Sequence, residues 1–183
     1  MIQFESSFIE GFLLLNKFFA AHKMRYCLFG GIAAGYWGEP RYTRDMDFVV
    51  VTRTGNIKKL LNELKKEKFK FEKKGDWQIK IQGKGNLVFL ADIILAETEY
   101  QDWVVQRAKP VKIFDVSVPI CSPEDLIILK LIANRRQDLL DIEKILARHW
   151  DTLNKQYLKE WFAFWEIEKL FKQEFGANFP LIM

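Results

Sequence analysis

Apolar residues recur along the chain with two different periods, and each period predicts a different kind of element. Near the N-terminus, apolar positions from Phe4 to Phe19 follow helical spacing and predict an amphipathic helix. The short apolar run 26–29 predicts a buried strand, and 32–37, rich in Ala and Gly, predicts a short helix that ends at Pro40. The apolar run 46–52 then predicts a strand, and 55–68 predicts a second amphipathic helix.

The second half of the chain begins with three predicted strands, at 69–71, 77–81 and 87–95. The last is apolar except for Asp92, which predicts a strand buried on both faces. Residues 97–103 are interpreted as a polar connection, and 111–114 with 116–120 as a hairpin near a sheet edge. Ser122 followed by Pro123 predicts a helix start. A further helix is expected at 136–147, and one long aromatic-rich helix at 151–175.

Composition narrows the class of protein. The 183 residues are 49% hydrophobic and include sixteen Phe, enough for a packed core, so a disordered chain is excluded. Cys27 and Cys121 lie in apolar runs without metal-ligand spacing, which indicates buried free thiols in a reducing compartment. No basic N-terminal region precedes an apolar stretch, and no apolar run reaches the roughly 20 residues of a membrane-spanning helix. We therefore expect a cytoplasmic protein.

The net charge of +4 is unevenly distributed. Residues 53–84 contain eleven Lys or Arg against four Asp or Glu. A basic segment in an otherwise weakly acidic chain is typical of proteins with an anionic partner, either nucleic acid or a nucleoside triphosphate. The alternative is a solvated helix and hairpin whose lysines only keep the protein soluble.

Asp45 and Asp47 lie in a predicted strand and are separated by one residue. Because the side chains of residues i and i+2 of a strand project from the same face, the two carboxylates point the same way. Two adjacent carboxylates repel each other unless they share a hard cation, and Mg²⁺, which prefers oxygen ligands, is the natural ion for such a site. Asp92 on a neighbouring strand could supply a third carboxylate and complete a two-ion site. Otherwise Asp92 sits at a strand end, facing solvent or an arginine.

Backbone groups upstream could bind phosphate. Gly30 and Gly31 follow a short strand and precede a helix, so their N–H groups can approach phosphate oxygens. The polar turn between that helix and the next strand offers further candidates for orienting phosphates or supporting the carboxylates: Arg41, Thr43 and Arg44. The P-loop and zinc-protease motifs are absent, and His22 and His149 are far apart in sequence, which gives histidine-based catalysis little support.

The pattern GG-x-A followed by R-x-T-x-D-M-D resembles the signature of the DNA polymerase β-type nucleotidyltransferase superfamily. It is carried here by Gly30, Gly31, Ala33, Arg41, Thr43, Asp45 and Asp47. The chain is most similar to the AbiEii-like bacterial branch, which includes nucleotidyltransferase toxins of toxin–antitoxin systems. The stretch SPEDLIILKLIANRRQDLLDI resembles the helical segment of that branch, and the resemblance covers most of residues 26–147.

The resemblance implies an α+β fold, a nucleotidyltransferase-type mixed sheet flanked by helices. We expect a core at 1–121 with an N-terminal helix, and a C-terminal helical segment at 122–183. Asp45, Asp47 and Asp92 would be the catalytic metal ligands, binding Mg²⁺ or alternatively Mn²⁺. Lys130 would contact the triphosphate. Asp141 would share a face with Lys130 if one helix spans both. Asp138 and Asp141 could instead be caps or ion-pair partners.

The expected activity is transfer of a nucleoside monophosphate from an NTP such as ATP to a hydroxyl acceptor. RNA, in particular tRNA, is the favoured acceptor because of the basic segment and the toxin relatives. A cognate antitoxin or toxin protein is a second expected partner. Two alternatives stay open: modification of a small molecule such as an aminoglycoside or lincosamide, and a non-catalytic binding protein on the same scaffold.

Overall fold

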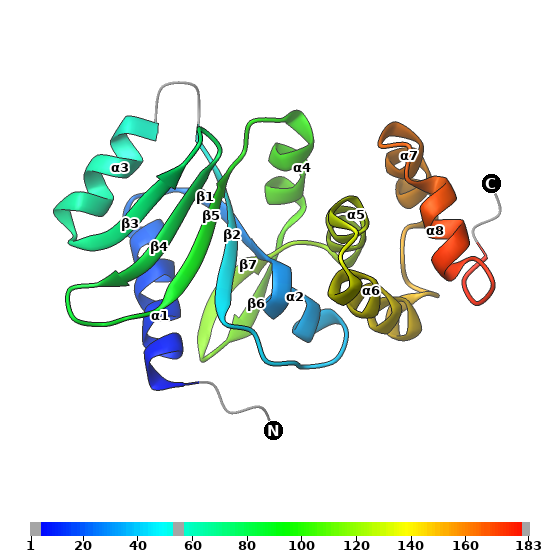
Figure 1. The fold of residues 1–183 in the computed structure, drawn as a ribbon, viewed down its shortest axis with the longest axis horizontal. Helices are drawn as coiled ribbons and strands as arrows, with labels where there is room; N and C mark the ends of the chain where they lie inside the picture. Colours follow the sequence, from blue (N-terminus) through cyan, green and yellow to red (C-terminus); the bar gives the residue numbers. More distant parts are fainter. Residues whose placement is uncertain (1–4, 53–56, 181–183) are drawn as a thin grey trace. The chain divides into compact units, whose positions relative to one another are not determined.

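The computed structural model describes residues 5–52 and 57–180 (Figure 1). It divides into two compact units. Unit 1 contains the residues up to 32 together with 42–121, and unit 2 contains 33–41 together with the residues from 122 onward. The segment 33–41 thus belongs with residues more than eighty positions later. Arg53 of the basic segment, and residues 55 and 56 of the predicted second helix, lie outside the described part of the chain.

The described residues of unit 1 form one seven-stranded mixed sheet with the order β3-β4-β5-β2-β1-β7-β6. The strands are β1 Arg25–Phe29, β2 Asp45–Val51, β3 Phe69–Lys74, β4 Gln78–Lys84, β5 Leu90–Leu95, β6 Lys109–Ile113 and β7 Val116–Ile120. Strand β2 is antiparallel to β1 and parallel to β5, so β2 and β5 run in the same direction at the centre of the sheet. The predicted hairpin is confirmed as β6 and β7, at one edge.

Eight helices are described, and most follow the predicted pattern. They are α1 Ser6–Ala21, α2 Gly30–Trp37, α3 Ile57–Lys66, α4 Glu99–Arg107, α5 Pro123–Ala133, α6 Arg136–His149, α7 Lys155–Phe164 and α8 Glu168–Phe175. As predicted, Ser122 caps α5: its hydroxyl accepts a hydrogen bond from the backbone N–H of Asp125. Together with the sheet, these helices confirm the expected α+β class. No helix in the described part of the chain has the length and apolar character needed to cross a bilayer.

Helices α1 and α3 cover the same face of the sheet. The rings of Phe12 and Phe19 on α1 pack against Phe48 of β2, and the residue that ends α1, His22, contacts Glu63 of α3. Since Phe48 follows Asp47 directly, the carboxylates of β2 project from the other face. On that other face, α4 packs against β1 and β2. The buried residues Phe48, Ile79 and Ile93 therefore form the core between the sheet and α1 with α3.

Unit 2 is helical. Helices α5 and α6 are joined at Asn134, which adopts the left-handed conformation (φ 48°) at the end of α5. The segment 33–41 contacts α6 through its carbonyl groups: His149 hydrogen-bonds to the carbonyl oxygen of Trp37 at 2.8 Å, and Arg148 donates to that of Gly38. Helix α7 packs against α5 and α8. These contacts explain why 33–41 groups with the C-terminal residues.

Two helix predictions are wrong. Residues 97–103 are not a polar connection, because helix α4 begins at Glu99. Thr98 and Gln101 form a capping box at its start, and Tyr100 and Val104 are buried at helical spacing. The aromatic-rich C-terminal stretch is not one helix: Glu166 adopts a left-handed φ of 56°, which separates α7 from α8. In both stretches a polar residue marks a helix boundary, Thr98 at the start of α4 and Glu166 between α7 and α8, and the hydrophobic pattern does not indicate it.

The prediction of a strand over 87–95 that is buried on both faces is also wrong. Strand β5 begins at Leu90, and the side chain of Leu90 is 47% exposed. Along β5, buried Ala91 and Ile93 alternate with exposed or half-buried Leu90, Asp92 and Ile94. Because every second side chain of this apolar strand is exposed or half-buried, no described helix covers that face of the sheet fully at β5.

Candidate active site

Strands β2 and β5 bring three aspartates together. In the parallel pairing of these strands Asp47 lies opposite Asp92, and Asp45 lies opposite Leu90. Residues directly opposite each other project from the same face, so all three carboxylates share the face that lacks α1 and α3. Each offers a carboxylate oxygen within 4.8 Å of the others, and they form the one such group of His, Cys, Asp or Glu in the described residues.

Gly30 makes room for Asp47. Its φ is +65°, a conformation that favours glycine, and a Cβ built there would lie 1.9 Å from Oδ2 of Asp47. Phe29, which precedes it, lies opposite Asp47 in the pairing of β1 with β2. The backbone N–H of Gly31 points to Oδ2 of Asp47 at 3.3 Å, in the first turn of α2. The glycine pair therefore fits tightly against one carboxylate on the β1 side of the cluster.

Thr43 supports the second carboxylate of β2. Its side chain is 7% exposed, and its hydroxyl lies 3.3 Å from Oδ1 and 3.2 Å from the backbone oxygen of Asp45. The hydroxyl thus orients the start of β2. Arg44, the next residue, is exposed and lines a small pocket of about 240 Å³ beside Thr43 and Leu90. It is available to an anionic ligand.

The surroundings of Asp92 act on its carboxyl in opposite directions. Burial raises the pKa of its carboxyl, and the charge of Asp45 raises it further, while Lys80 and Gln78 act in the opposite direction. Lys80 lies opposite Asp92 in the pairing of β4 with β5, and its Nζ is 3.8 Å from Oδ1 of Asp92. Lys80, whose side chain is 45% exposed, is thus an ion-pair partner of Asp92.

The donor set fits a hard divalent cation. Three carboxylates supply oxygen atoms, the ligand type that Mg²⁺ and Mn²⁺ prefer, and no nitrogen or sulfur donor joins them in the described residues. A cation shared by Asp45, Asp47 and Asp92 would offset the two effects that raise the pKa of Asp92, its burial and the charge of Asp45. The cluster can therefore serve as a metal site that also holds phosphate oxygens.

Unit 2 holds a second group of predicted site residues in a buried ionic cluster. Nζ of Lys130 lies 2.9 Å from Oδ1 of Asp138 and 2.6 Å from Oδ2 of Asp141, with all three side chains at most 5% exposed. Arg41 donates two hydrogen bonds to Asp141, each 2.8 Å long. Helices α5 and α6 are separate, yet they bring Lys130 and Asp141 into contact across their junction.

The charges in this cluster lower the pKa of both carboxyls. Burial by itself would raise the pKa of Asp141, but hydrogen bonds from Arg41 and Lys130 outweigh it and hold the pKa below its usual value. Asp138 behaves in the same way, with Arg135 and Lys130 as its donors. The ion-pair role that the sequence left open for Asp138 and Asp141 is thus present in the structure.

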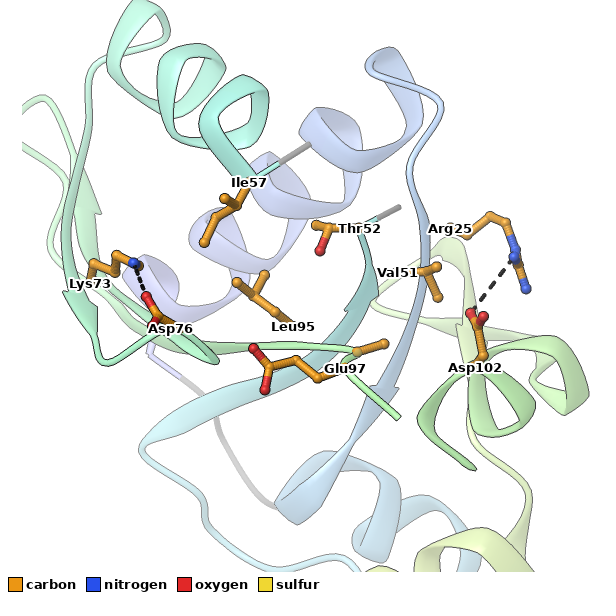
Figure 2. A pocket seen from close by; sticks show the side chains of 10 residues that line it. Arg25, Val51, Thr52, Ile57, Lys73, Asp76, Leu95, Glu97 and Asp102 are labelled. Atoms are coloured by element: carbon orange, nitrogen blue, oxygen red, sulfur yellow. Dashed lines mark hydrogen bonds and ion pairs between the residues drawn. The ribbon is translucent and has the colours of Figure 1, made fainter. Parts of the chain in front are cut away.

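A larger pocket of unit 1 lies away from the carboxylates. It has a volume of about 810 Å³ and is found at the end of β2 and β5, where Thr52 and Leu95 line it (Figure 2). Figure 2 also shows the ion pairs at its rim, Arg25 with Asp102 and Lys73 with Asp76. Leu95 is three residues beyond Asp92, a distance of about 10 Å along a strand. This pocket therefore lacks the carboxylate cluster.

Sequence reasoning missed Lys80 and Gln78 as neighbours of Asp92. Both lie in the predicted strand 77–81, where they alternate with buried Ile79 and Ile81. That alternation places them on one face but does not say which strand they neighbour. Pairing of β4 with β5 supplies this information, and it has no local sequence signal.

The fold is that of the nucleotidyltransferases. Residues 14–176 match the family described as "Nucleotidyltransferase of unknown function (DUF6036)". Because the match covers most of the 183 residues, the chain belongs to this family. No curated protein matches the chain. The specific assignment to the AbiEii-like branch remains a prediction.

Solved structures with similar folds include an antigenic nucleotidyltransferase-like protein from Paracoccidioides brasiliensis, with 19% identity, 92% of each chain covered and a TM-score of 0.57. The lincosamide antibiotic adenylyltransferase LnuA, bound to lincomycin, has 16% identity over 74% of this chain and 94% of its own, with a TM-score of 0.54. ANT(2")-Ia in complex with adenylyl-2"-tobramycin has 14% identity over 86% and 97%, with a TM-score of 0.59. At these identities the similarity establishes the fold.

Proposed function

We propose that the protein is a Mg²⁺-dependent nucleotidyltransferase that transfers a nucleoside monophosphate from an NTP to a hydroxyl group of RNA. The observation that carries this proposal is the set of three carboxylates, Asp45, Asp47 and Asp92, with oxygens within 4.8 Å of one another. Membership of a nucleotidyltransferase family supports the same reaction class. The three residues are the proposed metal ligands.

In the proposed reaction, an acceptor oxygen forms a bond to the α-phosphorus of the NTP and the bond to the bridging oxygen of pyrophosphate breaks. The acceptor proton passes to water, and pyrophosphate leaves. Bound Mg²⁺, or Mn²⁺ in its place, supplies charge neutralisation at the phosphates and a lowered pKa for the attacking hydroxyl. The chain holds its carboxylates in place through the N–H of Gly31 and the hydroxyl of Thr43.

The nucleotide-binding residues are part of the same proposal. Gly30, Gly31, Thr43 and Arg44 surround the carboxylates in unit 1. Arg41, Lys130 and Asp141, the predicted triphosphate contacts, form the ionic cluster of unit 2. Asp141 would act there by fixing the positions of two cations rather than by touching an anionic substrate, because a carboxylate repels phosphate.

RNA is preferred as the acceptor because of the charge of residues 53–84, and tRNA is the first form to test. A role in a toxin–antitoxin pair, with a cognate protein partner, follows from the sequence resemblance alone. Small-molecule acceptors are the alternative class, since two proteins of similar fold are named as an adenylyltransferase acting on a lincosamide and an enzyme bound to adenylyl-tobramycin.

The test is transfer of label from each of four α-phosphate-labelled NTPs to total RNA with Mg²⁺ present. We expect labelled RNA from the wild-type protein and none from Asp45→Asn. A matched control is Asp115→Asn, an equal change at a 94%-exposed aspartate of the β6–β7 turn, where the left-handed φ of 65° suits asparagine. This control should retain full transfer.

Two results would change the proposal. Transfer that persists in Asp45→Asn would remove the carboxylate mechanism. Transfer to an aminoglycoside or a lincosamide, with none to RNA, would move the acceptor to the small-molecule class. If calorimetry detects neither Mn²⁺ nor NTP binding, the protein is a non-catalytic member of its family.

A further inference from the structure

The open face of β3, β4 and β5 continues directly from the three carboxylates. Lys80 lies opposite Asp92, which lies opposite Asp47, so these three residues form one row across β4, β5 and β2. Residues in such a row share a face of the sheet. Helices α1 and α3 pack on the other face, against Phe48 and Phe69 among others. The carboxylate site thus opens onto a sheet surface.

The side chains on this open face are polar and include more basic than acidic groups. Glu72 lies opposite Lys80, and residues that alternate with them along β3 and β4 share their face as far as the register shift next to Lys70. Lys70 keeps this face, because it lies between Phe69, which packs against Phe18 of α1, and Phe71, which lies opposite buried Ile81. The set, named here the open-face residues, is exposed apart from half-buried Gln78 and consists of Lys70, Glu72, Lys74, Gln78, Lys80 and Gln82. It contains three lysines and one glutamate. The basic segment that the sequence indicates therefore contributes three of its lysines to the surface beside the carboxylates.

The geometry of the glycine pair fixes the direction from which an acceptor approaches. Gly30 and Gly31 lie on the β1 side of Asp47, and they are the proposed phosphate contacts. In phosphoryl transfer, the attacking oxygen and the leaving group lie roughly in line on opposite sides of the phosphorus. Pyrophosphate held toward β1 therefore places the acceptor over β5 and β4. This step rests on the proposed function.

We propose that the open face binds the sugar–phosphate backbone of the acceptor RNA and guides its terminal hydroxyl to the carboxylates. Lys80, next to Asp92, would contact the phosphate closest to the attacking hydroxyl. Lys70 is two residues further along the neighbouring strand, about 8 Å from Lys80 between Cα atoms, and would contact a phosphate further from the end.

Other side chains on the same face suit this ligand. Leu90 is 47% exposed and lies opposite Asp45, where it offers an apolar surface to a ribose or base at the end of the strand. Gln78 and Gln82 can hydrogen-bond to ribose hydroxyls or bases. A polycationic acceptor such as an aminoglycoside would meet repulsion from Lys70 and Lys80. The face therefore favours a polyanion.

Binding of fluorescein-labelled RNA, followed by fluorescence anisotropy without NTP, tests this surface separately from catalysis. We expect Lys70→Gln/Lys80→Gln to weaken binding about tenfold or more at moderate salt, and to lower the slope of log K against log salt by about two. The control is Lys58→Gln/Lys59→Gln, with the same charge change at exposed residues of α3, which packs on the opposite face. It should bind like wild type.

The outcomes separate this inference from the proposed function. Wild-type binding and salt slope in the Lys70/Lys80 variant, or a larger loss in the Lys58/Lys59 control, would overturn the open face as the RNA surface. Absence of RNA binding by the wild-type protein would overturn it too. Loss of RNA binding in the Lys70/Lys80 variant alone supports the surface, even if Asp45→Asn shows that the transfer reaction was assigned wrongly.

Because Lys80 lies beside Asp92, its substitution could weaken RNA binding by disturbing the proposed metal site, and a second measurement distinguishes this effect from loss of a phosphate contact. Mn²⁺ binding, followed by electron paramagnetic resonance, should not weaken in Lys80→Gln. In the transfer assay the variant should raise KM for RNA and leave kcat and the NTP dissociation constant within about twofold of wild type. A lowered kcat with unchanged KM would instead assign Lys80 to the metal site.

Discussion

The aspartates of unit 1 and those of unit 2 are surrounded by different charges. In unit 2, Asp138 and Asp141 are buried and each receives hydrogen bonds from two or more cationic or amide groups. In unit 1, Asp45, Asp47 and Asp92 converge, and Nζ of Lys80 lies 3.8 Å from Oδ1 of Asp92. The pKa of Asp141 is lowered and that of Asp92 is raised.

The difference shows how the same residue type takes different roles. A buried carboxylate that the chain itself neutralises holds elements together, and here it joins α5, α6 and Arg41. Carboxylates that lie close together repel one another, which costs folding free energy, and an external cation offsets that cost. Four predictions follow from this contrast, ordered from the largest expected effect.

Lys130→Met should destabilise the protein by about 3–5 kcal/mol, because it removes the one cation shared by two buried carboxylates. Equilibrium unfolding in urea measures the loss. The control Lys144→Met changes an exposed lysine of α6 that pairs with Glu39, and should cost less than about 1 kcal/mol. Equal stability of Lys130→Met and wild type would mean that the cluster does not hold unit 2 together.

Gly30→Ala should lower the rate of transfer by about a hundredfold, because the added Cβ displaces the carboxylate of Asp47 from its position. Gly85→Ala is the matched control: it has a similar φ of +59°, but nothing lies within 4 Å of the added Cβ. Both variants carry backbone strain, and only Gly30→Ala disturbs the carboxylates. Steady-state kinetics with Mn²⁺ titration separates backbone strain from displacement of Asp47: only Gly30→Ala should lower the transfer rate and weaken Mn²⁺ binding.

Asp92→Asn should stabilise the metal-free protein by about 1 kcal/mol, the scale of the repulsion between carboxylates about 4 Å apart in water. The same variant should lose the rise in Tm that Mg²⁺ gives to wild type. Thermal unfolding with and without Mg²⁺ checks both expectations. A lower Tm for metal-free Asp92→Asn would show that Lys80 neutralises the cluster well enough.

Acid should weaken unit 2 through its carboxylates. The pKa values of Asp138 and Asp141 are lower in the folded state, so their contribution to stability is complete above the unfolded pKa of about 3.9 and is lost as the pH falls through the folded values. The free energy of unfolding should therefore fall more steeply below about pH 4 in wild type than in Asp138→Asn/Asp141→Asn. Urea unfolding followed by circular dichroism between pH 2 and 5 measures this. If the free energy of unfolding fell equally with pH in both proteins, Asp138 and Asp141 would not be the carboxyls that cause the acid sensitivity.

Local sequence determined much of the secondary structure. The period of two in strands places Asp45 and Asp47 on one face before any tertiary contact is known. Gly30, at a positive φ, and Ser122, at a helix start, are further cases in which a residue's own chemistry fixes the local backbone. The α+β class and the hairpin of β6 and β7 follow from similar local patterns. Helix α4 was missed because the polar residues around its few buried apolar positions, Tyr100, Val104 and Val105, were interpreted as a connection and the capping box of Thr98 and Gln101 was overlooked.

Only the tertiary structure decided which charges meet. Arg41 and Asp141 are one hundred residues apart, and Lys80 reaches Asp92 through pairing of β4 with β5. Such contacts depend on strand order and helix packing, which hydrophobic periodicity does not encode. The sequence by itself thus placed Asp45 and Asp47 on one face of a strand and predicted a metal-binding role for them with Asp92. The fold determined which aspartates lie within reach of Lys130 and Arg41 and which converge on one another, because these interactions depend on distance in space.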